Sequence, residues 1–268
     1  QPSVEMEWFK HIDDEGSHRF RSSELGQNDQ LYVVGQGDGD MILDNSTILK
    51  SVEDEEGYIL EFSENGNLMS TFETTGRKLQ TINGIKTNKS GYRFITGYFE
   101  QKIDLGNGII LEARAHRDSY VAKFDKNWNC QWATQEKSSQ NFEGFEVGLD
   151  DNGYIYVASN HTWNSELSDG TTLSADLHDI IVLKYNQNGK LIDYALPTEN
   201  DGHDSEDGDR PWEIIVDPKG NFYITGYFRY NFNFGPGYDL NSRGKTDTYL
   251  AKYNSNCVLQ WAKQIGGN

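Results

Sequence analysis

Short runs of alternating apolar and polar residues follow one another along the whole chain. The clearest runs are four to seven residues long and are separated by turns that contain glycine or asparagine. Alternation with a period of two is the pattern of a β-strand, in which successive side chains point to opposite faces. No stretch shows a sustained helical period. The pattern therefore predicts an all-β protein made of many short strands.

The predicted strands recur in four copies. A strand that follows a glycine-rich hairpin is centred on residues 33, 95, 157 and 224, which are 62, 62 and 67 positions apart. A second strand, preceded by an acidic residue, recurs at 58–62, 120–124, 181–185 and 249–253. A third strand carries Trp132, Tyr194 or Trp261, and 69–72 take its place in the first copy. Three markers in register predict a repeat architecture.

Each copy contains four consecutive strands, here called a, b, c and d. Asn-Gly pairs at 65–66 and 188–189 are strong signals for the hairpin between strands c and d. One four-stranded sheet cannot bury both of its faces, so such units must stack, and radial stacking gives a propeller. The sequence predicts an all-β β-propeller with four-stranded antiparallel blades, in a single domain over 1–268. The expected blades are residues 20–73, 79–135, 142–196 and 211–264.

One further strand is predicted before the first blade. Residues 4–12 include Trp8, which lies 124 positions, or twice the repeat, before Trp132. This is one outer strand more than four complete blades need. We expect the blades to belong to a longer array, in which case one apolar blade face is exposed and the protein associates with itself or with a partner. The alternative is a ring that is closed through Trp8.

Composition narrows the classes of partner. The chain is 35% apolar and 13% aromatic, which indicates several small cores closed by large rings instead of one large core. A net charge of −18 repels phosphate, so we expect neither nucleic acid nor an anionic membrane as a partner. No apolar run has the length of a membrane helix, so membrane insertion is not expected either. Cations, basic proteins and neutral glycans are left.

The two cysteines, Cys130 and Cys257, stand at non-equivalent positions of two copies. Free buried thiols are the simpler expectation, and a disulfide between them is the alternative.

Copy four resembles a known family. The resemblance rests on residues 216–227 (Val-Asp-Pro-Lys-Gly-Asn-Phe-Tyr-Ile-Thr-Gly-Tyr), 234–235, 247–253 (Asp-Thr-Tyr-Leu-Ala-Lys-Tyr) and 260–267 (Gln-Trp-Ala-Lys-Gln-Ile-Gly-Gly). These segments are similar to the bacterial β-propeller repeat family called SBBP, and copy two is similar to it through 95–98, 103–106 and 118–132. The resemblance implies a propeller in a secreted or surface-bound bacterial protein. It implies no catalytic residues, because the family motif is a folding motif.

Residues that recur in every copy are expected to serve the fold. The repeated aromatic residues of strand d are expected in the core, the acids before strand c as turn caps, and the lysines of strand c facing solvent. Better candidates for ligand binding are aromatic residues that break the repeat. These are His161 and Trp163 after strand b of copy three, Trp128 in the c–d turn of copy two, and Trp212 before strand a of copy four.

An acidic segment lengthens the link into copy four. Its carboxylates, with glycines between them, could wrap Ca²⁺, which takes six to eight oxygen ligands. A solvated acidic loop is the alternative, since the spacing is not that of an EF-hand. No other cofactor is expected. The candidate ligands are Asp201, Asp204, Glu206, Asp207 and Asp209.

Catalytic signals are absent from the sequence: the six histidines are scattered, and no nucleophile elbow or phosphate-binding glycine loop occurs. We therefore expect a non-catalytic binding or structural module of a secreted or cell-surface bacterial protein, adhesin-like or scaffold-like, with a protein or glycan ligand. The alternatives are a carbohydrate-active lyase or hydrolase that works in a propeller channel, and an intracellular interaction scaffold.

Overall fold

The computed structural model describes residues 8–14, 16–43, 46–50, 54–175, 179–197 and 209–267. These residues form 26 strands and no helix, which confirms the prediction of an all-β protein. None of them belongs to an apolar helix of a length that could cross a membrane.

Four antiparallel sheets contain strands a to d in chain order, and we call them blades one to four. Blade one contains β2 (Ser17–Leu25), β3 (Leu31–Asp38), β6 (Glu56–Phe62) and β7 (Leu68–Glu73). Blade two contains β9 (Gly84–Thr87), β10 (Arg93–Phe99), β13 (Asp118–Phe124) and β14 (Cys130–Ser138). Blade three contains β15 (Phe142–Leu149), β16 (Ile155–His161), β19 (Asp179–Tyr185) and β20 (Leu191–Ala195). Blade four contains β21 (Arg210–Val216), β22 (Phe222–Phe228), β25 (Asp247–Tyr253) and β26 (Leu259–Ile265).

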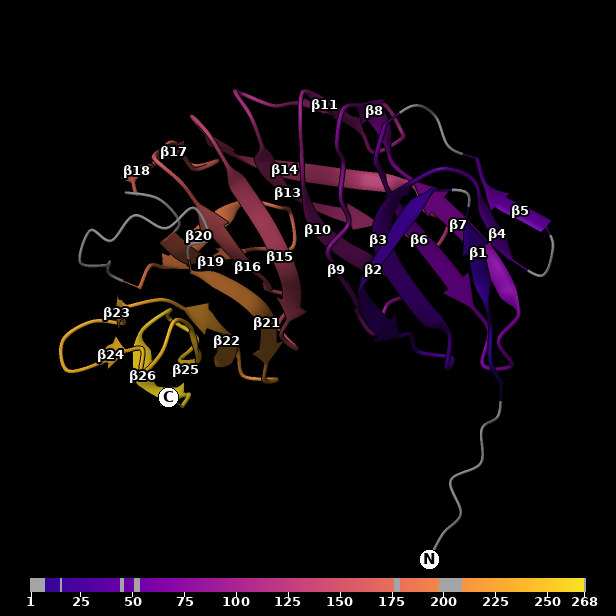
Figure 1. Ribbon diagram of the computed structural model, residues 1–268. Helices are drawn as coiled ribbons and strands as arrows, with labels where there is room; N and C mark the ends of the chain where they lie inside the picture. The colour runs from indigo at the N-terminus through magenta and orange to yellow at the C-terminus, as the bar shows by residue number, and fades with distance from the viewer. Residues whose placement is uncertain are drawn as a thin grey trace, which may run out of the picture.

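The blades stand side by side in an arc, with blade one at one end and blade four at the other (Figure 1). Innermost strands of successive blades contact one another, β2 with β9, β9 with β15, and β15 with β21. The cores lie between blades: one cluster joins Val34 and Ile59 of blade one to Ile95 and Tyr120 of blade two. Facing surfaces of successive blades are thus buried against each other, as the low apolar content requires.

Small hairpins between strands b and c extend the contacts from one blade to the next. They are β4–β5 (Met41–Leu43, Ser46–Leu49), β11–β12 (Lys102–Asp104, Ile110–Glu112), β17–β18 (Asn164–Glu166, Thr172–Ser174) and β23–β24 (Asn231–Asn233, Asp239–Asn241). The first three pair with the chain that precedes their blade: β1 (Ile12–Asp14) with β4, β8 (Thr75–Arg77) with β11, and the end of β14 with β17.

In blades two, three and four the c–d turn contacts strand d of the blade before it. Trp132 of blade two donates from Nε1 to the carbonyl of Gln187, 3.1 Å away. A Cβ on Gly189, in the same turn, would lie 2.6 Å from that indole, so only glycine leaves room for the ring. At the junction of blades one and two the large residue lies in the turn and the small one on strand d. Trp128 occupies the turn and donates to Ser70 Oγ, 3.2 Å away. A large residue therefore faces a small one at both junctions.

The strand register corrects one prediction about strand d. Trp132 lies opposite Lys123 and Trp261 lies opposite Lys252, but the residue opposite Lys184 is Asp193. Tyr194 is therefore not the structural equivalent of the two tryptophans. The same bulge follows each of these lysines, so the three blades share one register; the tryptophans lie nine positions after their lysines and Tyr194 lies ten positions after Lys184.

The repeated polar residues behave only partly as expected. Asp118 is buried and accepts hydrogen bonds from the backbone amides of Arg114 and Ser138, which confirms the capping role. One lysine of strand c clearly does not face solvent. Lys184 is 8% exposed and donates to the Ser255 carbonyl of the next blade, 2.6 Å away. The prediction was wrong for Lys184 because this side of strand c of blade three packs against blade four, whereas Lys123 and Lys252 are half-buried. Both cysteines are free thiols.

Candidate functional site

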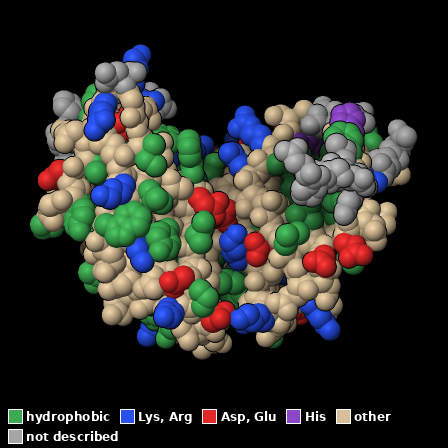
Figure 2. Space-filling view, turned by 90° about the horizontal axis from the view of Figure 1, so that it is seen from below, with side chains coloured by type: hydrophobic (Ala, Val, Ile, Leu, Met, Phe, Trp, Pro, Cys, Tyr) green, Lys and Arg blue, Asp and Glu red, His purple; other side chains and the backbone are tan. Residues whose placement is uncertain are grey.

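A hollow of about 410 Å³ lies where the innermost strands of the four blades converge. Side chains of all four blades line it: Arg21, Ser22, Ser23, Asn83, Tyr98, Glu143, Phe145, Glu146, Arg210, Trp212 and Glu213. Viewed from below, the surface of the molecule is notched between two lobes, and charged side chains of both signs lie among apolar ones (Figure 2).

A β-bulge recurs in the innermost strand and directs one residue per blade toward this hollow. The pairing of strands a and b shifts between Phe20 and Ser22, between Gly144 and Glu146, and between Pro211 and Glu213. In blade two the paired part of strand a begins at Gly84, the residue after the equivalent position. A bulge leaves one residue outside the ladder and redirects its side chain. The residues at this position are Arg21, Asn83, Phe145 and Trp212.

These four bulge residues differ in chemistry although their positions are equivalent. Trp212 is 60% exposed and makes an edge contact with Tyr227, with ring centroids 5.3 Å apart. Asn83 is buried and donates to the Gly144 carbonyl at 2.7 Å, while its Oδ1 has no hydrogen-bond partner among the described residues. The hollow thus combines a cation, an amide and two aromatic rings, a mixture that can recognise an amphipathic ligand.

Two arginines of the end blades supply positive charge beside the rings. The Arg210 guanidinium lies 5.9 Å from the centre of the Phe145 ring, and its buried Nε has no hydrogen-bond partner among the described residues. Arg21 donates from Nε to Gln36 Oε1 at 3.2 Å. Burial raises the pKa of Glu146 to about 7, against the opposing effect of the nearby Lys86, so this wall carries less negative charge than its composition indicates.

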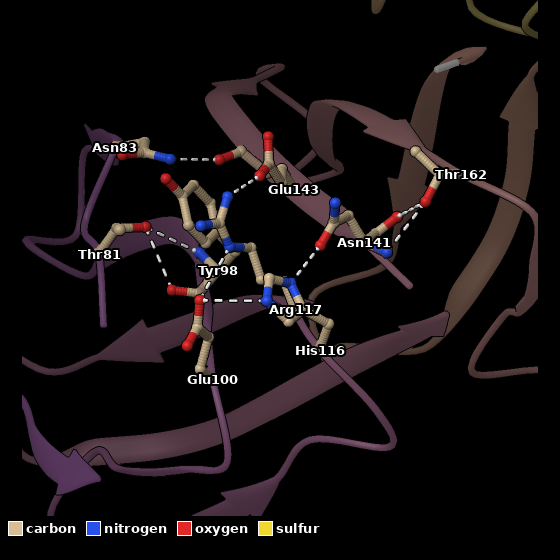
Figure 3. A network of polar contacts seen from close by, with 10 residues as sticks. Thr81, Asn83, Tyr98, Glu100, His116, Arg117, Asn141, Glu143 and Thr162 are labelled. Carbon is tan, nitrogen blue, oxygen red and sulfur yellow. Dashed lines mark hydrogen bonds and ion pairs between the residues drawn. The ribbon is translucent and has the colours of Figure 1, made fainter. Parts of the chain in front are cut away.

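An ion-pair network holds the wall between blades two and three (Figure 3). Arg117 lies between two carboxylates and donates to Glu100 at 3.1 Å and to Glu143 at 2.7 Å. Its guanidinium also lies 5.2 Å from the centre of the Tyr98 ring. Although burial opposes its charge, these carboxylates raise the pKa of Arg117 further. The Tyr98 and Glu143 side chains that line the hollow are therefore fixed in position.

The residues predicted to bind ligand do not lie together. Trp212 lines the hollow, whereas Trp163 is 53% exposed in the b–c link of blade three. Trp163 has a φ of 56°, and Tyr230, at the equivalent position of blade four, has a φ of 58°. The backbone at Trp163 therefore adopts a turn that recurs in blade four, so Trp163 does not break the repeat. Trp128 is half-buried between blades one and two, under the Arg93 guanidinium at 4.2 Å.

His161 needs a correction, because its burial does not fit a surface binding role. It is 0% exposed, stacks on Phe142 and shares a hydrogen bond with Ser165 Oγ at 3.1 Å. It lies opposite Asp179, just as Phe99 lies opposite Asp118, and so takes the place of a core phenylalanine. Burial lowers its pKa to about 4.

The acidic segment is described only at its end. Asp201, Asp204, Glu206 and Asp207 lie outside the described residues. Asp209 is buried and accepts from the backbone amide of Arg229 at 3.0 Å, so its carboxylate fixes the start of β21. Across the described ranges, no three histidine, cysteine or acidic residues form a group that could hold a metal ion.

Three of the four bulge residues escaped the sequence interpretation, which looked for aromatic residues that break the repeat. Arg21, Asn83 and Phe145 are 62 positions apart, and Trp212 follows after 67, the same spacing as the strand markers. The sequence therefore did contain an indication of these site residues: one position of the repeat holds a different residue type in each copy. Such a position becomes recognisable only when the bulge shows where its side chain points.

Comparison with known proteins supports the repeat at a coarse level. No protein family model matches the chain. The chain is 21% identical over 144 residues to an uncharacterized WD repeat-containing protein of Acanthamoeba polyphaga mimivirus. The match covers 52% of this chain and 10% of that protein, so the chain spans only a small part of its relative. WD repeats form four-stranded propeller blades, in agreement with the four sheets. Neither comparison points to the SBBP family or to a bacterial source.

Proposed function

We propose that this chain is a non-catalytic protein-interaction module that binds a peptide segment of its partner in the hollow. The observation that carries the proposal is the bulge of the innermost strand. Residues that build the blades are repeated, whereas the bulge position holds Arg21, Asn83, Phe145 and Trp212. A position that is structurally fixed and chemically varied is what recognition of one particular ligand requires.

The chemistry of the hollow supports a peptide ligand. Tryptophan, tyrosine and arginine dominate the residues that carry binding energy in protein interfaces. Here Trp212 and Phe145 offer an apolar surface, and Arg21 and Arg210 stand beside it. The volume of about 410 Å³ suits one or two side chains. We expect the bound segment to present an aromatic or large aliphatic residue next to a carboxylate.

The finer role rests on the sequence. The resemblance to SBBP repeats and the net charge of −18 favour a secreted or cell-surface bacterial module with an adhesin-like or scaffold-like role. The exposed Trp163 is the residue that would stack on a sugar if the ligand were a glycan.

Selection of displayed peptides against the immobilised protein tests the proposal. Peptides recovered with the wild type are then measured against Trp212→Ala and against Trp163→Ala, which removes an indole of similar exposure outside the hollow. We expect Kd to rise at least tenfold for Trp212→Ala, or about 1.4 kcal/mol, and to stay unchanged for Trp163→Ala. Peptides that bind both variants as well as they bind the wild type would place the site elsewhere.

A glycan array and a panel of polysaccharide substrates separate the alternatives. Glycan binding that is lost in Trp163→Ala and kept in Trp212→Ala would replace the peptide proposal with a lectin-like function. Turnover of any polysaccharide would overturn the assignment as a non-catalytic module.

A further inference from the structure

The face of blade four that points away from blade three is an incompletely covered blade surface. Along β22 and β25 buried residues alternate with half-buried ones, whereas β10 and β16 are buried along their whole length. Strand pairing places Ile215, Tyr223, Lys252 and Trp261 in one row across this face. Ile215 is 62% exposed.

The residues of this face match those that blade two buries against blade three. Tyr223 and Leu250 occupy the register positions of Phe94 and Val121, which are 3% and 1% exposed. Phe94 and Val121 pack with apolar residues of blade three in one cluster. The open face of blade four therefore has the side chains of a blade junction.

The tryptophan on this face specifies its counterpart. Trp261 stands at the position of Trp132, whose ring requires Gly189 in the facing c–d turn. Among the four c–d turns, positive φ occurs at Gly66, Trp128, Gly189 and Cys257, so only two offer glycine. Gly189 is already covered by Trp132 inside the arc. The turn that Trp261 fits is the Gly66 turn of blade one.

Within one molecule, Trp8 covers the Gly66 turn. Its Nε1 donates to the Glu64 carbonyl at 2.9 Å, and a Cβ on Gly66 would lie 2.7 Å from its ring. Trp132 makes the same two contacts with Gln187 and Gly189. Trp8 thus stands where the outer strand of a neighbouring blade would stand. It is held by this bond, by ring contact with Phe62 and by the three-residue pairing of β1 with β4.

We propose that blade four docks on blade one of a second copy of this chain, with Trp261 taking the Gly66 turn in place of Trp8. The contact joins two different surfaces, so it repeats from copy to copy and either closes a ring or continues. Trp8 is then an intramolecular competitor that limits the association.

Charge favours the same pairing. Lys184 of blade three donates to the Ser255 carbonyl in the turn of blade four. Lys252 occupies the position of Lys184, and Glu64 occupies the turn position of Ser255. In the docked pair, Lys252 meets both the carbonyl and the exposed carboxylate of Glu64.

Light scattering coupled to size-exclusion chromatography tests the proposal across a concentration series. The single chain has a mass of 30.5 kDa. We expect Trp8→Ala to reach at least twice this mass at a concentration at least tenfold lower than the wild type needs. Adding Trp261→Ala should return it to the single-chain mass, and adding Trp163→Ala should not. Equal profiles for Trp8→Ala and the wild type, or association that survives Trp261→Ala, would refute the proposal.

A charge exchange keeps the test informative if Trp8→Ala does not fold. In the chain that retains Trp8, Lys252→Glu should abolish self-association at the highest concentration, and Lys252→Glu combined with Glu64→Lys should restore it. A double variant that is not restored, or a wild type and a Trp8→Ala variant that both stay monomeric at every concentration, argues against docking at this turn.

Discussion

The contact between Trp132 and Gly189 can be measured by a double-mutant cycle. Trp132 is half-buried, so Trp132→Ala removes part of the 3–5 kcal/mol that a buried tryptophan contributes, together with the hydrogen bond to Gln187. We expect the free energy of unfolding to fall by about 3 kcal/mol. Gly189→Ala has two costs, because its φ of 77° is unfavourable for alanine and its Cβ would lie 2.6 Å from the indole.

The two costs of Gly189→Ala can be separated within this chain. Gly91 has a φ of 78° and nothing within 4 Å of its Cβ position, so Gly91→Ala reports the backbone cost alone, about 1–2 kcal/mol. We expect Gly189→Ala to cost 1–3 kcal/mol more than this, because the ring must move. In a chain that already carries Trp132→Ala, the cost of Gly189→Ala should fall toward that of Gly91→Ala, with a remainder from Thr134 Oγ1, which would lie 2.9 Å from the new Cβ.

Urea unfolding followed by far-ultraviolet circular dichroism gives the four free energies. The expected interaction energy between the two positions is about 1–3 kcal/mol. If Gly189→Ala costs no more than Gly91→Ala in the wild type, or if the two substitutions are additive, the turn does not require glycine because of the indole. The inference that a large residue must face a small one at each blade junction would then be wrong.

Three further predictions concern buried ionisable groups and the acidic segment. The native pKa of His161, about 4, lies below its ordinary 6.5, so stability is lost as pH falls through this range, and His161→Phe should remove about 2–3 kcal/mol of that loss at pH 4. Burial raises the pKa of Glu136 from 4.5 to about 7, so stability falls as pH rises between these values, and Glu136→Gln should flatten that slope. Millimolar Ca²⁺ should raise Tm, because a ligand at a hundredfold excess over its Kd stabilises the folded state by about 2.7 kcal/mol. The rise in Tm should vanish in the triple variant Asp204→Asn, Glu206→Gln and Asp207→Asn.

The same urea titrations, repeated at pH 4, 5, 6 and 7.5, check the two pH predictions. Glu112→Gln, which changes an exposed carboxylate, is the control for Glu136→Gln. An unchanged pH profile in His161→Phe would mean that His161 is not held neutral by burial. For the acidic segment, Mg²⁺ at equal concentration is the control, and an unchanged Tm with Ca²⁺ would leave it as a solvated loop.

The candidate site was only partly predictable. Trp212 could be recognised because a tryptophan directly before strand a is unusual in this repeat. His161 misled the interpretation, since a histidine after a strand has the composition of a site. In the fold it fills the slot of Phe99, as the 62 positions between them already indicate and the pairing with Asp179 shows. Residue type identifies candidates, but burial decides whether a ligand can reach them.

The sequence by itself determined the blades, because their causes are local and repeated. Alternation fixes which residues form strands, turns such as 217–220 fix where the strands reverse, and the 62-residue spacing shows that one unit recurs. The tertiary structure decided what faces what. The bulges of the innermost strands directed Arg21 and Phe145 into one hollow. Contacts between residues 62 or more positions apart depend on how whole sheets pack, and a strand pattern carries no information about the neighbouring sheet.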